Sequence, residues 1–137
     1  MSEAMTQYTT GADQAYFEGL EAGEVRVQSC AGCGTVHWPA VFRCPECGSW
    51  EHKWKAVKPV GKVFSWTRTW HDFGAPKQLQ PPFVTLVVTL DGVDHVRLLG
   101  TLDKPDEPVS IGQDVEGRIE TFDFQGRKIP ALIWSKV

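Results

Sequence analysis

Every cysteine of the sequence lies in one short segment, where two Cys-x-x-Cys pairs are separated by ten residues. The first pair is Cys30 and Cys33, and the second is Cys44 and Cys47. Zn²⁺ prefers four thiolates at the corners of a tetrahedron, and a gap of two residues lets one tight turn present two sulfurs to the same ion. The spacing therefore predicts one zinc ion bound by all four cysteines.

Two disulfides are the alternative use of four cysteines. Nothing at the N-terminus resembles a signal peptide, and paired Cys-x-x-Cys turns in a cytosolic chain favour a metal over disulfides. We therefore expect a cytoplasmic protein that carries zinc. Gly34 and Gly48 directly follow the second cysteine of each pair, where the chain often takes a positive φ that glycine tolerates without strain.

Four thiolates complete the coordination of the predicted ion, and this limits what the site can do. No position is left for water or substrate, so we expect the metal to be structural. No cysteine remains to act as a nucleophile, and His37 is not needed as a ligand. Metal binding of order ~10 kcal/mol would become folding free energy for residues 25–56, which are too few to build their own core.

A short helix is expected before the cysteines. It begins after Thr9 or Thr10 as the N-cap and ends at Gly23. Its apolar residues, at spacings of three and four, form one stripe: Tyr16, Phe17 and Leu20. A helix of this length is marginal alone, so the stripe packs either on the chain's own metal-binding segment or on another subunit. Residues 24–30 alternate and predict a strand that leads into the first Cys-x-x-Cys turn.

After residue 57 the pattern changes to short strands separated by turn residues, as in a small closed barrel. Five strands are expected, at 60–70, 83–91, 93–102, 113–123 and 128–136. Asp91-Gly92 is a strong signal for a two-residue hairpin turn, and Gln125-Gly126 is a weaker one. The predicted fold is mainly β: tail and helix at 1–24, a zinc ribbon at 25–57 and a five-stranded OB-fold barrel at 58–137.

The charge of the chain argues against a polyanionic partner. The formal net charge is −3, and four thiolates (−4) with Zn²⁺ (+2) bring it to about −5. This is not the basic surface that neutralising phosphates requires. No apolar run approaches the roughly 20 residues that span a bilayer, so we expect no membrane association.

The sequence also offers one pair of residues that could act in catalysis. His71 and Asp72 begin a long connection, residues 71–82, between the first two expected barrel strands. Adjacent residues of an extended chain point to opposite faces, and no nucleophile stands nearby, so we expect a loop anchored by aromatic packing. A hydrolase or lyase that uses these two residues remains a hypothesis. Phosphate-binding, nucleophile-elbow and His-Glu-x-x-His motifs are absent from the sequence.

Several of these segments together resemble one known family, the bacterial and archaeal proteins with a rubredoxin-like zinc ribbon followed by an OB-fold, long classified as a domain of unknown function. The resemblance covers nearly the whole chain, and the order of ribbon and barrel makes it specific. The segments that carry it are Tyr16-Phe17, the two cysteine pairs, Trp38-Pro39, the run 61–67 (Gly-Lys-Val-Phe-Ser-Trp-Thr), Pro82-Phe83-Val84, the run 96–100 (Val-Arg-Leu-Leu-Gly) and Ile111-Gly112.

The resemblance implies an accessory role. Members of that family accompany thiolase-like enzymes, including acyl-CoA thiolases, acyltransferases and the retro-aldolases of steroid side-chain degradation. This chain would then be a non-catalytic subunit, such as one of lipid, steroid or aromatic acyl-CoA degradation, that stabilises a thiolase-like partner and helps to shape its acyl-CoA site. The family supplies no catalytic motif to carry over. Five basic residues could meet a CoA phosphate: Lys62, Arg68, Arg97, Arg127 and Lys128.

The alternative function is a module that binds single-stranded nucleic acid. Zinc ribbons and OB-folds both occur in such proteins, and the aromatic content of 11% suits base stacking. The negative net charge does not suit it, and we expect the accessory role instead.

Overall fold

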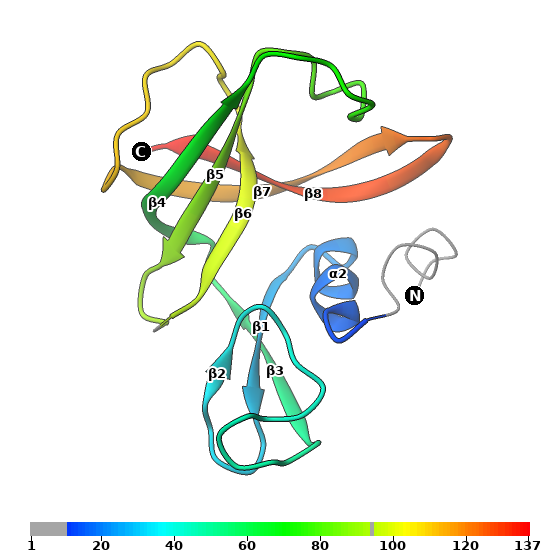
Figure 1. The fold of residues 1–137 in the computed structure, drawn as a ribbon, viewed down its shortest axis with the longest axis vertical. Coiled ribbons are helices and arrows are strands. Elements are labelled where there is room, and N and C mark those ends of the chain that lie inside the picture. The colour runs from blue at the N-terminus through cyan, green and yellow to red at the C-terminus, as the bar shows by residue number, and fades with distance from the viewer. Residues whose placement is uncertain (1–10, 94) are drawn as a thin grey trace. The chain divides into compact units, whose positions relative to one another are not determined.

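The structure, a computed structural model, describes residues 11–93 and 95–137 (Figure 1). Its contacts divide the chain into two compact units, Met1–Lys58 with Gly92–Val96, and Pro59–Asp91 with Arg97–Val137. The first unit contains α2 (Gln14–Glu21), β1 (Val25–Cys30), β2 (Val36–His37) and β3 (His52–Val57). The second contains β4 (Val60–Thr69), β5 (Phe83–Leu90), β6 (Arg97–Leu102), β7 (Asp114–Phe124) and β8 (Arg127–Lys136).

The first unit is built on a three-stranded antiparallel sheet in the order β2-β1-β3. Its central strand β1 runs along the whole of β3, from the pair Val25 and Val57 to the pair Cys30 and His52. The predicted strand at 24–30 is confirmed. We did not predict β3, because its sequence His-Lys-Trp-Lys-Ala-Val has little apolar character. It is held in place through β1, which is largely buried.

Helix α2 packs its apolar stripe on its own unit. Tyr16 and Leu20 are buried, and the Tyr16 ring lies 4.5 Å from the Trp38 ring, centroid to centroid. Burial raises the pKa of the Tyr16 hydroxyl to about 12. Of the two alternatives for this stripe, packing within the chain is therefore what the structure contains, since these contacts already bury its aromatic residue.

The predicted start of the helix was wrong and its end was right. The N-cap is Asp13, which makes no side-chain capping bond. The predicted caps Thr9 and Thr10 lie outside the described residues. At the C-terminal end Gly23 has φ +87°, and the Glu24 N–H donates to the Gly19 carbonyl at 2.7 Å. A left-handed glycine directly after a helix ends it by this pattern of bonds.

The second unit contains the five predicted strands, which close into a ring in the order β4-β5-β6-β8-β7. All neighbours are antiparallel except β6 and β8, which run parallel through Thr101 and Leu102. This ring is the OB-like arrangement that the strand pattern predicted. Alternate residues of β5 face the core, and Val84, Leu86 and Val88 are fully buried.

One of the two hairpin predictions needs correction. Strand β6 begins at Arg97, not at residue 93, so residues 91–96 connect it to β5 and the predicted two-residue turn at Asp91-Gly92 is wrong. His95 in this connection has a positive φ of 66°, which breaks the extended run. The weaker signal was correct: Gln125 and Gly126 alone join β7 to β8, with φ values of 51° and 75°, as a type I′ turn requires.

Two close contacts define the core of the ring. Trp134 of β8 is fully buried, and its indole approaches β6 at Gly100. A Cβ at residue 100 would lie 2.5 Å from the indole Nε1 and 2.6 Å from the Leu132 carbonyl oxygen. Glycine is therefore the residue that leaves room for the tryptophan at this position.

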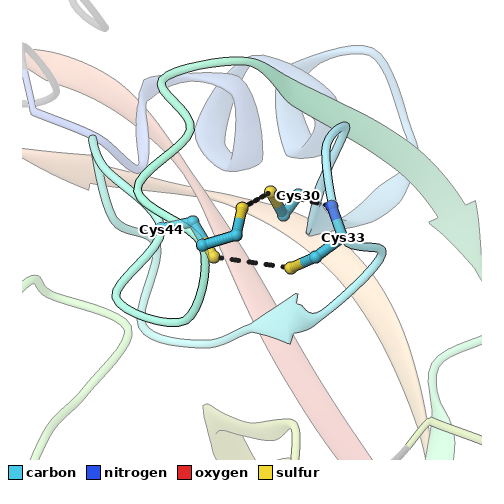
Figure 2. A group of neighbouring side chains, drawn as sticks. Cys30, Cys33 and Cys44 are labelled. Atoms are coloured by element: carbon cyan, nitrogen blue, oxygen red, sulfur yellow. Dashed lines mark hydrogen bonds between the residues drawn. The ribbon is translucent and has the colours of Figure 1, made fainter.

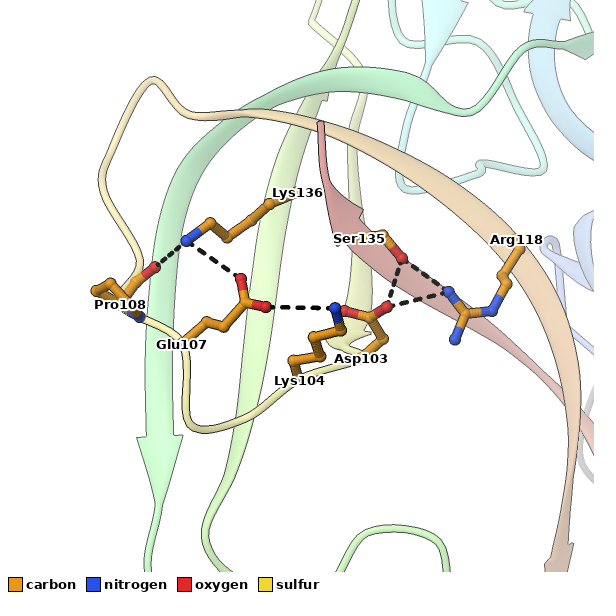
Figure 3. Close-up of polar contacts among 7 residues, drawn as sticks. All are labelled: Asp103, Lys104, Glu107, Pro108, Arg118, Ser135 and Lys136. Carbon is orange, nitrogen blue, oxygen red and sulfur yellow. Dashed lines mark hydrogen bonds and ion pairs between the residues drawn. The ribbon is translucent and has the colours of Figure 1, made fainter.

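Charged side chains fasten the connection between β6 and β7 to strands β7 and β8 (Figure 3). The Asp103 carboxylate accepts hydrogen bonds from the Ser135 hydroxyl at 2.7 Å and from Arg118 at 3.3 Å. Further along, Lys136 pairs with Glu107 at 3.2 Å and donates to the Pro108 carbonyl at 3.0 Å. Burial acts to raise the pKa of Asp103, but bonds from Ser135 and Arg118 outweigh it, so this pKa is lowered.

Candidate metal centre

The four cysteines converge at one end of the ribbon sheet. Cys30 is the last residue of β1, and Cys33 follows in the turn after it. Cys44 and Cys47 come from a second turn of the same design: the Gly34 N–H donates to the Cys30 carbonyl at 2.9 Å, and the Gly48 N–H to the Cys44 carbonyl at 2.8 Å. Both glycines have φ +80°, as the sequence predicted.

The spacing of the sulfurs fits one tetrahedral zinc ion. All four Sγ atoms lie within 4.8 Å of one another. Figure 2 shows the side chains of Cys30, Cys33 and Cys44 pointing toward one another. The Cys30 sulfur lies 3.5 Å from that of Cys47, and the Cys33 sulfur lies 3.7 Å from that of Cys44. A tetrahedron with Zn–S bonds of about 2.3 Å has sulfurs about 3.8 Å apart. The four cysteines are therefore positioned to bind a metal.

Hydrogen-bond donors beside Cys30 and Cys33 stabilise the thiolate form of these two residues. The N–H groups of Cys33 and Gly32 point at the Cys30 sulfur, at 3.5 and 3.3 Å. The Cys33 N–H is the main cause that lowers the pKa of Cys30 to about 6. The Thr35 hydroxyl, 3.1 Å from the Cys33 sulfur, is the main cause that lowers the pKa of Cys33. Thiolates are the form that binds zinc.

Cys47, in contrast, has a raised pKa. The Ser49 backbone N–H lowers the pKa of Cys47, but the neighbouring cysteine sulfurs, Cys30 first, and burial together raise it to about 12. Four thiolates at this spacing repel one another strongly. A divalent cation at their centre removes that repulsion, so the donor set and its electrostatics fit Zn²⁺.

Two residues besides the four cysteines support the cage, and of these only His37 was considered from the sequence. Gln28 is 1% exposed and binds both polar groups of Val41: its Nε2 donates to the Val41 carbonyl and its Oε1 accepts from the Val41 N–H, each at 2.9 Å. This clamp fixes the segment that joins the two cysteine turns. His37 Nε2 lies 3.4 Å from the Cys44 sulfur, so it contacts a cysteine of the cage from outside the four-sulfur group.

The other candidate residues do not gather into a second site. Asp72 accepts a hydrogen bond from the Gly74 N–H at 3.0 Å, which is a local turn contact, and His71 is exposed. Trp70 and Phe73 beside them are 67% and 74% exposed, so the predicted anchoring of this loop by aromatic packing is wrong. Among the basic residues, Arg68 donates to the carbonyls of Pro105 and Glu107. Arg97 lies 4.1 Å from the centre of the Phe64 ring.

Lysines 62 and 128 are each paired with a carboxylate. Lys62 pairs with Asp114, and Lys128 with Asp123 at 2.7 Å. Arg127 begins β8 at the tip of its hairpin with β7. The five basic residues therefore belong to different local arrangements.

Comparison with known proteins follows the same division into two parts. The family model described as ChsH2, rubredoxin-like zinc ribbon domain, matches residues 17–51. The model described as ChsH2, C-terminal OB-fold domain, matches residues 54–120. Together they cover most of the sequence, in the order that the family has. This chain belongs to the ChsH2 family. The rubredoxin-like ribbon and the four converging cysteines together are consistent with a structural zinc ion.

Solved structures agree on the fold of this ChsH2-family chain. The structure titled "Ltp2-ChsH2(DUF35) aldolase" is 23% identical, with a TM-score of 0.77 over 93% of this chain and 95% of that one. A protein of unknown function from the DUF35 family of Sulfolobus solfataricus is 20% identical, with a TM-score of 0.60 over 98% of this chain and 91% of that one. No curated protein sequence matches this chain. Within residues 11–93 and 95–137, no helix is long and apolar enough to cross a membrane.

Proposed function

We propose that this chain is a non-catalytic accessory subunit of a thiolase-like acyl-CoA enzyme, such as a thiolase, an acyltransferase or a retro-aldolase. In this role it stabilises the catalytic subunit and helps to shape its acyl-CoA site. The observation that carries the proposal is the match of both parts of the chain, in order, to the two ChsH2 domains. It is supported by the likeness to a chain whose structure is titled an Ltp2-ChsH2(DUF35) aldolase.

The chemistry of the chain is compatible with this role. We propose that Cys30, Cys33, Cys44 and Cys47 are the ligands of the zinc ion, and that the chain supplies no catalytic residue. An ion held by four thiolates has no open position for a substrate, so the metal holds the ribbon together. We also propose that the chain is organised as tail and helix (1–24), ribbon (25–57) and OB-fold (58–137), in the cytoplasm and apart from membranes.

Co-expression tests the proposal. The chain should co-purify with a thiolase-like protein encoded beside it, and acyl-CoA turnover should require both proteins. The matched control is the same preparation with His71→Ala, which should leave turnover unchanged because we propose that the chain supplies no catalytic residue. Turnover by the isolated chain, or failure to co-purify with any thiolase-like neighbour, would refute the accessory role.

A module for single-stranded nucleic acid is the second candidate, and one observation favours it. Two aromatic rings of β4, Phe64 and Trp66, are exposed, and an arginine lies over each, at 4.1 and 5.4 Å from the ring centres. Such platforms stack bases. A shift of single-stranded DNA or RNA by micromolar protein that weakens with salt would support this candidate, and no shift at low salt would exclude it.

A further inference from the structure

The OB-like unit presents an apolar patch on the outer side of three neighbouring strands. We call it the Phe64 face, and it consists of Phe64 of β4, Val87 of β5, and Arg97 and Leu99 of β6. Val87 is paired with Leu99 on one side and with Ser65, next to Phe64, on the other. Leu86 and Val88 on either side of Val87 are fully buried, whereas Phe64 is 49% and Leu99 61% exposed. These side chains therefore point away from the core.

A β-bulge places Phe64 on this outer side. The register between β4 and β5 shifts between Val63 and Ser65, so Phe64 is the extra residue of β4. Val63 before it is buried in the core. Bulges redirect side chains and are concentrated at functional positions of sheets. The sheet thus holds a large aromatic ring in solvent on a rigid strand, where burying it against another surface would be favourable.

Arg97 gives the Phe64 face its charge. Its guanidinium lies 4.1 Å from the centre of the Phe64 ring, and no carboxylate of residues 11–93 or 95–137 forms an ion pair with it. The residues beside it in the ladder, such as Thr89, are neutral. An aromatic ring, a leucine and an arginine held together are the residue types that dominate the energy of protein interfaces.

We propose that the Phe64 face is the docking surface for the thiolase-like partner, and that the partner covers it with an apolar surface that carries a carboxylate opposite Arg97. This inference rests on the proposed function and adds the surface through which the accessory chain binds. A planar guanidinium already stacked on a ring is ordered before binding, so it can pair with a carboxylate in two-point geometry at low entropic cost.

Charge favours an acidic partner over the two other molecules that could cover the Phe64 face, a second copy of this chain and a single-stranded nucleic acid. In a two-fold contact between copies of this chain the face would meet itself, and two copies of Arg97 would approach with no carboxylate on the face to separate them. Single-stranded nucleic acid requires a groove with several cations, whereas the face offers one arginine in a chain of net charge −3. A protein surface that is apolar and acidic matches both the apolar side chains and the arginine of the Phe64 face.

The test compares two double variants of the full chain in binding to the co-expressed thiolase-like neighbour. Phe64→Ser with Leu99→Ser removes the apolar part of the Phe64 face. Trp70→Ser with Phe73→Ser is the matched control, because these two residues are 67% and 74% exposed in the loop after β4. We expect the first pair to raise the Kd by about tenfold or more, as for interface hot spots, and the control to leave it within about twofold.

A third variant and four further measurements complete the design. Arg97→Glu should raise the Kd at least as much, and added salt should then tighten the binding that remains, since an attractive charge pair is replaced by a repulsive one. Zinc content and circular dichroism should match the wild type in every variant, which separates lost docking from lost folding. Light scattering of the chain alone tests whether two copies associate. A gel shift with a single-stranded oligonucleotide tests whether the chain binds nucleic acid.

The outcomes separate the two proposals. If the wild-type chain binds no thiolase-like neighbour, the proposed function fails and the docking surface fails with it. If the wild type binds and the Phe64/Leu99 variant binds equally well, or the Trp70/Phe73 control loses as much affinity, the docking surface alone is refuted. A dimer or an oligonucleotide complex that is lost with Phe64→Ser would also refute it, because another occupant then covers the face.

Discussion

Removing the Gln28 clamp should loosen the metal site without touching a single ligand. Gln28→Ala deletes two buried hydrogen bonds, both 2.9 Å long, to the N–H and carbonyl of Val41. A buried polar group left without its partner costs about 1–3 kcal/mol. Both bonds are made by one side chain, so the two losses do not add in full. We expect the free energy needed to open residues 38–43 to fall by about 2–4 kcal/mol.

Zinc affinity reports this loss directly. The segment joins the turn of Cys33 to that of Cys44, so opening it separates the two halves of the cage. Because 1.4 kcal/mol corresponds to a factor of ten, the Kd for zinc should rise roughly 30-fold or more in the variant, so a competing chelator should remove the metal at a correspondingly higher free zinc concentration. Amide exchange at Val41 should accelerate by a similar factor, since its N–H loses its acceptor.

Ser29→Ala is the matched control for the clamp. Ser29 is the next residue of the same strand and pairs with Val36 and Lys53 through its backbone. Its substitution should leave zinc retention and amide exchange close to those of the wild type. Gln28→Ala with unchanged zinc retention and unchanged exchange at Val41 would show that the clamp does not hold the cage, and the reasoning would be wrong.

Three further changes have defined outcomes. Cys44→Ser should abolish stoichiometric zinc binding, measured by metal analysis, and unfold the ribbon while the strands of the OB-like unit keep their circular dichroism, because the ligand set is incomplete. Gly100→Ala should destabilise the OB-like unit by about 1–3 kcal/mol in urea, since the new Cβ would lie 2.5 Å from the Trp134 Nε1; Leu99→Ala, on the exposed side of the same strand, should cost much less. Asp103 has a lowered pKa in the folded chain, so the unfolded chain binds its proton more tightly. Its contribution to stability is therefore complete above the ordinary aspartate pKa of about 3.9 and disappears as the pH falls through the lower folded value. The acid unfolding of Asp103→Asn should accordingly begin from a lower stability and depend less on pH in that range, and identical curves for both proteins would contradict this role.

The sequence was most informative where side chains must satisfy a strict local geometry. The two-residue gaps of the cysteine pairs allow few arrangements other than a shared ion, and the structure brings the four sulfurs within 4.8 Å. Gln125-Gly126 predicted its turn correctly because both residues need a positive φ. The strand expected at 83–91 is β5, and its core-facing residues Val84, Leu86 and Val88 are buried.

The sequence was least informative where the environment decides the structure. Strand β3 has a charged, weakly apolar sequence and exists because β1 supplies a partner along its full length. Asp91-Gly92 has the chemistry of a tight turn, but His95 takes a positive φ and the strands separate over 91–96. Gln28 could not be recognised as a clamp because nothing local links it to Val41, thirteen residues away.

The bulge at Phe64 shows how such long-range effects bear on function. Simple alternation from Val63 would turn Ser65 toward the core and Trp66 outward. The register instead pairs Ser65 with Val87 on the outer side and Trp66 with Leu86, although Trp66 is itself 36% exposed. The inserted residue thus leaves two consecutive side chains, Phe64 and Ser65, on the exposed side of one strand. A stable ring does not need an exposed aromatic at this position, since its core is filled by residues such as Trp134 and Leu86. The exposure of this ring on a rigid strand is the observation from which we propose that a partner surface covers it.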